Sequence, residues 1–92
     1  MERYIIGIDA EYQTDPEDKD RNIILSYQWF CMAGDDQWSG IHYPKQGQRI
    51  TLIDWIYRAI KSRPGTTRWP DELQLVYHFG TAELSTVTDW GW

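Results

Sequence analysis

Residues 4–11 of this chain form an apolar run that ends in two acidic residues, Asp9 and Glu11. Such a run is typical of a central, largely buried β-strand. Side chains two positions apart on a strand project from the same face, about 6–7 Å apart. Asp9 and Glu11 are therefore predicted to lie together, beside Ile5 and Gly7.

Two carboxylates on a buried strand need a positive partner, because an unpaired buried charge is costly. No Lys or Arg is close in sequence on the same face. Oxygen ligands suit a hard divalent cation, so bound Mg²⁺ or Mn²⁺ is the simplest hypothesis. The alternative is that Asp9 and Glu11 are solvated at the end of a strand and inert.

Length and charge restrict the classes of function. The 92 residues are enough for a single domain, residues 1–92, and the net charge is −5. Residues 1–40 carry a net charge of −6 and residues 41–70 a net charge of +5. An acidic site beside a basic segment suits an enzyme that holds metals and binds phosphate, while the alternative is a helix with a charged outer face.

The single cysteine, Cys31, excludes an internal disulfide and predicts a reducing compartment, the cytoplasm. No signal peptide is evident, and no apolar run has the length needed to span a membrane. We therefore expect a cytoplasmic chain with no membrane association.

The chain is predicted to be an α/β protein with elements in the order βββαβα. Polar loops bound the predicted strands, which are residues 3–12, 23–33, 38–43 and 73–79. Short loops join the first three strands, so they form an antiparallel meander. A helix precedes the fourth strand, which can therefore lie parallel to the first. The helices are expected to pack on the sheet.

The first predicted helix has clear boundaries. Thr51 is a suitable N-cap with Asp54 three residues later, and Pro64-Gly65 ends the helix. A second helix is predicted over residues 82–90. The apolar positions of the first helix that recur at helical spacing are Ile53, Ile56, Tyr57 and Ile60.

Six tryptophans are many for this length. Trp29 and Trp55 lie within apolar patterns and are predicted to be core residues. The others are predicted to be exposed, where an indole can stack on a nucleobase or mark a protein interface. The interface is favoured, except for Trp69, which follows Arg68. The tryptophans predicted to be exposed are Trp38, Trp69, Trp90 and Trp92.

Two short motifs carry a resemblance to a known family. GIDAEY (residues 7–12) and HFGTAEL (residues 78–84) resemble two motifs of the DEDD (DnaQ-like) 3′–5′ exonucleases, in the ribonuclease H-like superfamily. In that family the first strand carries Asp-x-Glu, and a later motif of the type His-Asn-x-x-Phe-Asp-Leu supplies another acid. The resemblance implies the N-terminal part of a ribonuclease H-like fold.

The resemblance also implies residue roles. Asp9 would bridge two Mg²⁺ or Mn²⁺ ions, Glu11 would hold the ion that binds the attacking water, and Glu83 would contact the other ion. The substrate would be the 3′ end of DNA or RNA. Weaker candidates for contacts with the nucleic acid are Tyr12, His78, Phe79, Arg68 and Trp69.

The chain departs from the family pattern in two ways. Glu83 replaces the Asp of the second motif, and the family's final motif, a Tyr or His followed by Asp, is absent. The family's fifth strand is also missing, so we expect either a longer chain or a partner chain to complete the sheet. Three functions remain open: part of a two-metal exonuclease, an inactive exonuclease-like module for binding or assembly, and an unrelated α+β interaction domain.

Overall fold

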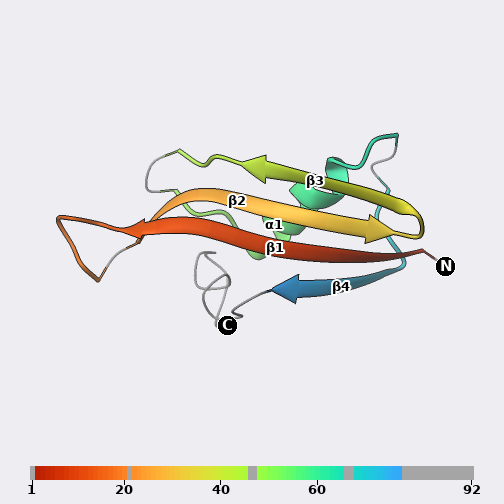
Figure 1. The fold of residues 1–92 in the computed structure, drawn as a ribbon, viewed down its shortest axis with the longest axis horizontal. Helices are drawn as coiled ribbons and strands as arrows, with labels where there is room; N and C mark the ends of the chain where they lie inside the picture. The colour runs from red at the N-terminus through yellow and green to blue at the C-terminus, as the bar shows by residue number, and fades with distance from the viewer. Residues whose placement is uncertain (1, 21, 46–47, 66–67, 78–92) are drawn as a thin grey trace.

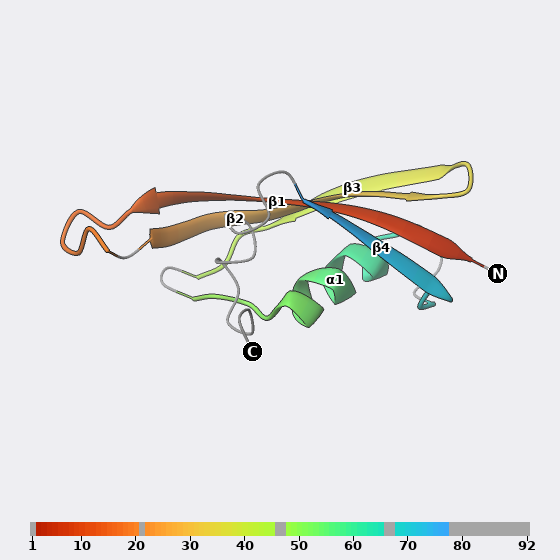
Figure 2. The same ribbon diagram turned by 90° about the horizontal axis from the view of Figure 1, so that it is seen from below.

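The structure is a computed structural model, and it describes residues 2–20, 22–45, 48–65 and 68–77. Its elements are β1 (Arg3–Thr14), β2 (Asn22–Ala33), β3 (Asp36–His42), α1 (Leu52–Lys61) and β4 (Glu72–Tyr77). The strands form one mixed sheet, and α1 lies across one of its faces (Figures 1 and 2). This order, βββαβ, is the predicted α/β arrangement and is consistent with a partial ribonuclease H-like fold. The second predicted helix, residues 82–90, is outside the described residues.

The sheet has the strand order β3-β2-β1-β4. β1 pairs with β2 in antiparallel fashion and with β4 in parallel fashion, so the meander and the parallel fourth strand are both confirmed. β1 is therefore an inner strand, as predicted. Within the described part of the chain, β4 pairs only with β1 and forms an edge of the sheet.

The core lies between the sheet and α1. In β1, the buried side chains of Tyr4, Ile6 and Ile8 alternate with side chains that face the opposite way. Tryptophan indoles tie the helix to the sheet: Trp38 Nε1 donates to the carbonyl of Ala59 (2.8 Å), and Trp55 Nε1 donates to the carbonyl of Gln28 (3.1 Å). These bonds satisfy the polar edge of each buried ring.

The predicted environments of Trp29 and Trp55 are confirmed, and that of Trp38 is wrong. Trp29 and Trp55 are core residues, as predicted. Trp38 is not exposed in a turn, because β3 begins two residues earlier than expected and pairs Trp38 with Cys31. The Trp38 side chain is consequently buried under α1.

The start of α1 was predicted correctly, but part of its buried face was not. Thr51 is the N-cap, and its Oγ1 accepts a hydrogen bond from the backbone N–H of Asp54 (3.0 Å). Ile53 and Tyr57 are 56% and 44% exposed, against the prediction. The large Trp55 indole faces the sheet and turns these side chains outward, because burying the indole removes more apolar surface from water. The buried residues of α1 are Trp55, Ile56, Ala59 and Ile60.

None of the helices in the described ranges has the length and apolar character required to span a membrane.

Candidate functional site

Asp9 and Glu11 lie on the face of β1 that points away from α1. Their partners across the β1–β2 pair are Gln28 and Ser26, and the intervening strand positions alternate between the two faces. Asp9 is half-buried and Glu11 is exposed. Both carboxylates are therefore reachable from solvent, which differs from the buried pair expected from the sequence. Burial alone does not require a cation at this position.

A β-bulge follows the acidic pair. Glu11 pairs with Ser26, but Tyr12 pairs with Ile24, so the ladder passes over Leu25. A bulge bends a strand and changes the direction of nearby side chains, and bulges are frequent beside active sites. Tyr12, a weak candidate for nucleic-acid contact, is 41% exposed at this bulge.

A hollow of about 410 Å³ lies beside Asp9, between β1, β2 and β4. The floor of the hollow is open at Gly7, which pairs with Phe30 on one side and Val76 on the other. Asp9 is the one charged residue among the described residues that line it. The full lining is Gly7, Ile8, Asp9, Phe30, Val76 and Tyr77.

Phe30 and Val76 were not predicted to lie near Asp9. Neither is close to Asp9 in sequence, and only the strand register places them beside Gly7. The one signal in the sequence was the position of Phe30 next to Trp29, a predicted core residue, because neighbouring side chains on a strand point to opposite faces.

Arg68 and Trp69 were predicted to contact nucleic acid, but the structure does not bring them to Asp9. They line a different hollow of about 520 Å³, together with Arg3 and Asp71, at the amino end of β1. At roughly 3.3 Å per residue, Asp9 is about 20 Å further along the strand from Arg3. Trp69 is 47% exposed, as predicted.

The remaining predicted site residues, His78, Phe79 and Glu83, lie outside the described residues. Tyr77, the last residue of β4, pairs with Ile8, so β4 ends next to the β1 position that precedes Asp9. In residues 2–20, 22–45, 48–65 and 68–77, no three side chains of His, Cys, Asp or Glu are grouped as a metal site would require. Of the three acidic residues predicted to hold metal, the structure therefore describes Asp9 and Glu11.

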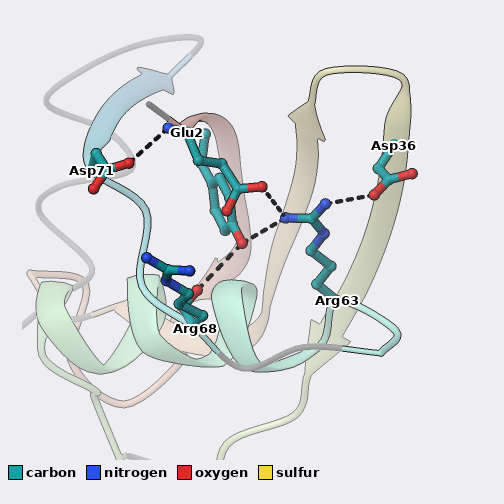
Figure 3. A network of polar contacts seen from close by, with 6 residues as sticks. Glu2, Asp36, Arg63, Arg68 and Asp71 are labelled. Carbon is teal, nitrogen blue, oxygen red and sulfur yellow. Dashed lines mark hydrogen bonds and ion pairs between the residues drawn. The ribbon is translucent and has the colours of Figure 1, made fainter.

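A second cluster of polar side chains surrounds Arg63 (Figure 3). Arg63 Nη1 donates to Tyr4 Oη (2.7 Å) and to Glu2 Oε2 (3.1 Å), and Nη2 donates to Asp36 Oδ2 (2.5 Å). The guanidinium carbon lies 5.2 Å from the Tyr4 ring centroid and 5.1 Å from that of Trp38. The hydrogen bonds to Asp36, Tyr4 and Glu2 raise the pKa of Arg63 above its usual value.

The Arg63 cluster has a structural role. It joins the start of β1, the start of β3 and the segment after α1. Arg58 is also paired, with Asp54 at 3.1 Å. Arg58 and Arg63, two basic residues of the segment 41–70, therefore form ion pairs with acidic residues of the same chain. This agrees with the alternative that the basic residues belong to a charged surface of the fold.

Comparison with known proteins gives one informative similarity. Primer-independent DNA polymerase PolB of Escherichia coli is 32% identical over an alignment of 91 residues, which covers 91% of this chain and 10% of the polymerase. The chain is similar to part of a DNA polymerase. It spans about a tenth of the length of the relative that it matches. No protein-family model and no solved structure matches the chain.

The side chains of Asp9 and Glu11 fit a hard divalent cation. Both provide carboxylate oxygens from one face of one strand, open to solvent. Mg²⁺ is commonly held by one or two carboxylates together with water and substrate phosphates, and it does not need a closed protein cage. Two solvent-accessible carboxylates, one of which lines a hollow, therefore suit an ion shared with a phosphate-bearing ligand.

Proposed function

We propose that this chain is the N-terminal portion of a two-metal-ion 3′–5′ exonuclease that hydrolyses phosphodiester bonds at nucleic-acid 3′ ends. The observation that carries the proposal is the position of Asp9 and Glu11 on the face of an inner strand that points away from α1, with Asp9 beside an open hollow. The similarity of the chain to part of a DNA polymerase supports nucleic acid as the ligand.

In this proposal Asp9, Glu11 and Glu83 hold Mg²⁺ or Mn²⁺. The bound ions would polarise the phosphoryl oxygen and lower the pKa of bound water. The residues of the chain hold and orient the ions, and the rigid β1 ladder fixes the direction of Asp9. The Glu11 side chain is placed next to the bulge, where the strand can adjust to the ligand.

Metal binding can be tested by thermal unfolding with and without Mn²⁺. A ligand that binds only the folded state stabilises it by about 2.7 kcal/mol at one hundred times its Kd. We expect Mn²⁺ to raise the Tm of the wild-type protein, and Asp9→Asn and Glu11→Gln to remove most of that increase. Glu17→Gln is the matched control, since it removes one exposed negative charge from the loop after β1. An increase that survives in Asp9→Asn would contradict the proposal.

The second candidate function is an exonuclease-like module that has lost cleavage and serves in binding or assembly. The exposed apolar side chains on the face opposite α1 favour it, since Phe30, Met32 and Ile41 are 58%, 47% and 44% exposed. Exposed apolar patches of this kind often mark interaction surfaces. β4, which pairs only with β1 among the described strands, is a further site at which another chain can pair.

The two candidates differ in their products. End-labelled single-stranded oligonucleotides, with either a free or a blocked 3′ end, are incubated with the chain and Mn²⁺. Release of mononucleotides from the free end alone supports the exonuclease. Metal binding through Asp9 without cleavage, together with self-association or a stable complex in light scattering, supports the assembly module.

A further inference from the structure

Phe30, next to the acidic pair, does not belong to the core that the described residues form. Phe30 is 58% exposed in the middle of β2, on the face opposite α1. It lies opposite Gly7, which has no side chain of its own on this face of the sheet. A Cβ at Gly7 would lie 3.4 Å from the Phe30 carbonyl oxygen and 3.9 Å from its Cβ, which is ordinary contact. The backbone therefore accepts a larger residue here, yet glycine keeps the hollow open.

We propose that Phe30 is a stacking platform for the unpaired base at the end of a single-stranded nucleic acid whose backbone reaches Asp9. This inference rests on the proposed function and names its substrate class. Phe30 and Asp9 line the same hollow, two strand positions apart in register, so one nucleotide can place its base and its phosphate at the two sites.

The negative charge of the hollow favours direct contact of the protein with a nucleobase over direct contact with a phosphate group. The one charged residue among its described lining is Asp9, which is negative. Residues 71–92, which include β4, contain no Lys or Arg. The anionic sugar–phosphate backbone of a nucleic acid has no direct electrostatic attraction to such a lining. Apolar contact with an aromatic ring does not depend on charge, and every base has a face that can stack.

The same geometry selects an unpaired end. A base inside a duplex has both faces covered by its neighbours, so it must be unstacked before a side chain can cover it. Val76 is 46% exposed on the other side of Gly7 and widens the apolar floor. Since the contacts are apolar, little preference among the four bases is expected.

The proposal is tested by measuring the binding of fluorescent single-stranded oligonucleotides by anisotropy. The buffer contains Ca²⁺, another hard cation with oxygen ligands, and a gel verifies that the oligonucleotide stays intact. Stacking is worth about 1–3 kcal/mol per base, so Phe30→Ala should weaken binding roughly 5- to 150-fold. Phe30→Trp should retain binding. Met32→Ala is the matched control, because Met32 is 47% exposed on the same face of the same strand.

A second oligonucleotide lacks only the base of its 3′-terminal nucleotide. We expect wild type and Phe30→Ala to bind this abasic oligonucleotide equally. Equal binding of the normal oligonucleotide by wild type and Phe30→Ala would overturn the proposal, as would an equal loss in Met32→Ala. An unchanged Tm shows that Phe30→Ala is folded, which its exposed position leads us to expect.

The outcomes separate this inference from the proposed function. If Mn²⁺ stabilises the protein through Asp9 but Phe30→Ala binds normally, only the stacking platform is rejected. If Asp9→Asn leaves the Mn²⁺ effect intact, the metal site is rejected whatever Phe30 does.

Discussion

The indole of Trp29 occupies the space in which a side chain at Gly40 would lie. The two residues pair across β2 and β3, and a Cβ at Gly40 would lie 2.6 Å from three atoms of the indole. The same indole donates from Nε1 to Ser62 Oγ (2.8 Å), just after the end of α1. A glycine in β3 thus lets Trp29 connect the sheet with the end of the helix.

Gly40→Ala is expected to destabilise the protein. The new methyl group would displace a buried indole and lengthen its hydrogen bond to Ser62, and such overpacking costs about 1–3 kcal/mol. Urea unfolding measures the change, with the exposed neighbour Ser39→Ala as control. A Gly40→Ala protein as stable as the control would contradict the packing described here.

Arg63→Ala is expected to lower the Tm more than Arg58→Ala does. Arg63 bonds with two acids and a tyrosine and has a side chain only 11% exposed. Arg58 forms an ion pair within α1, and its side chain is 40% exposed. Exposed pairs of the second kind contribute about 0.3–0.5 kcal/mol.

Arg63→Lys serves as the control for charge. It keeps the positive charge but cannot bond to Glu2, Tyr4 and Asp36 in the same planar arrangement. We expect an intermediate Tm in differential scanning calorimetry. An Arg63→Lys protein as stable as wild type would show that charge alone accounts for the cluster.

The stability of the protein is expected to decrease as the pH falls below about 6.5. Burial lowers the pKa of His42, the positive charge of Arg58 lowers it further, and Asp54 acts in the opposite direction. Arg58 Nη1 lies 3.2 Å from His42 Nδ1, and Arg58 can only donate, so the native imidazole is neutral and accepts. Above pH 6.5 both the native and the unfolded states are neutral. Below it, the unfolded state binds the proton more readily, so the free energy of unfolding falls.

Urea unfolding at pH 7.5 and pH 5.5 measures this effect of His42. His42→Gln should show a smaller difference between the two pH values than wild type. Arg58→Gln should also reduce the difference, because it removes one of the causes of the lowered pKa. If the change in the free energy of unfolding between the two pH values were identical in wild type and His42→Gln, the pH dependence would come from groups other than His42.

Cys31 is expected to resist alkylation while the protein is folded. Its side chain is 2% exposed, and burial raises the pKa of the thiol to about 12. At pH 8 only about one thiol in ten thousand is then ionised, and the thiolate is the reactive form. Mass spectrometry after iodoacetamide treatment should show modification in urea but not in buffer. Fast modification of the native protein would contradict the burial of Cys31.

Local features of the sequence predicted the local structure well. Thr51 and Asp54 mark the start of α1 because a cap depends on residues three positions apart. Alternation along β1 places Asp9 and Glu11 on one face, whatever the rest of the chain does. The intervening helix predicted that β4 would lie parallel to β1, and it does.

Features that depend on distant residues were predicted less well. Tyr57 belongs to the apolar stripe predicted from helical spacing but is 44% exposed, and Trp38 was predicted to be exposed but is buried. Helical spacing defines a stripe of apolar residues, but α1 has two stripes that overlap at Ile56 and Ile60. One stripe adds Ile53 and Tyr57, the other adds Trp55 and Ala59, and packing against the sheet buries the second. Trp38 was misplaced because the length of a hairpin turn depends on the pairing of β2 with β3.

By itself, the sequence determined the order of the elements, the helix cap and the shared direction of Asp9 and Glu11, because these follow from backbone periods and short-range contacts. Only the tertiary structure decided which face of β1 is covered, and hence that Asp9 borders an open hollow with Phe30. The tertiary structure also placed Arg68 and Trp69 at the far end of the strand. The reason is physical: isoleucines occupy both faces of β1, so only the docking of α1 and the register of three strands distinguish them.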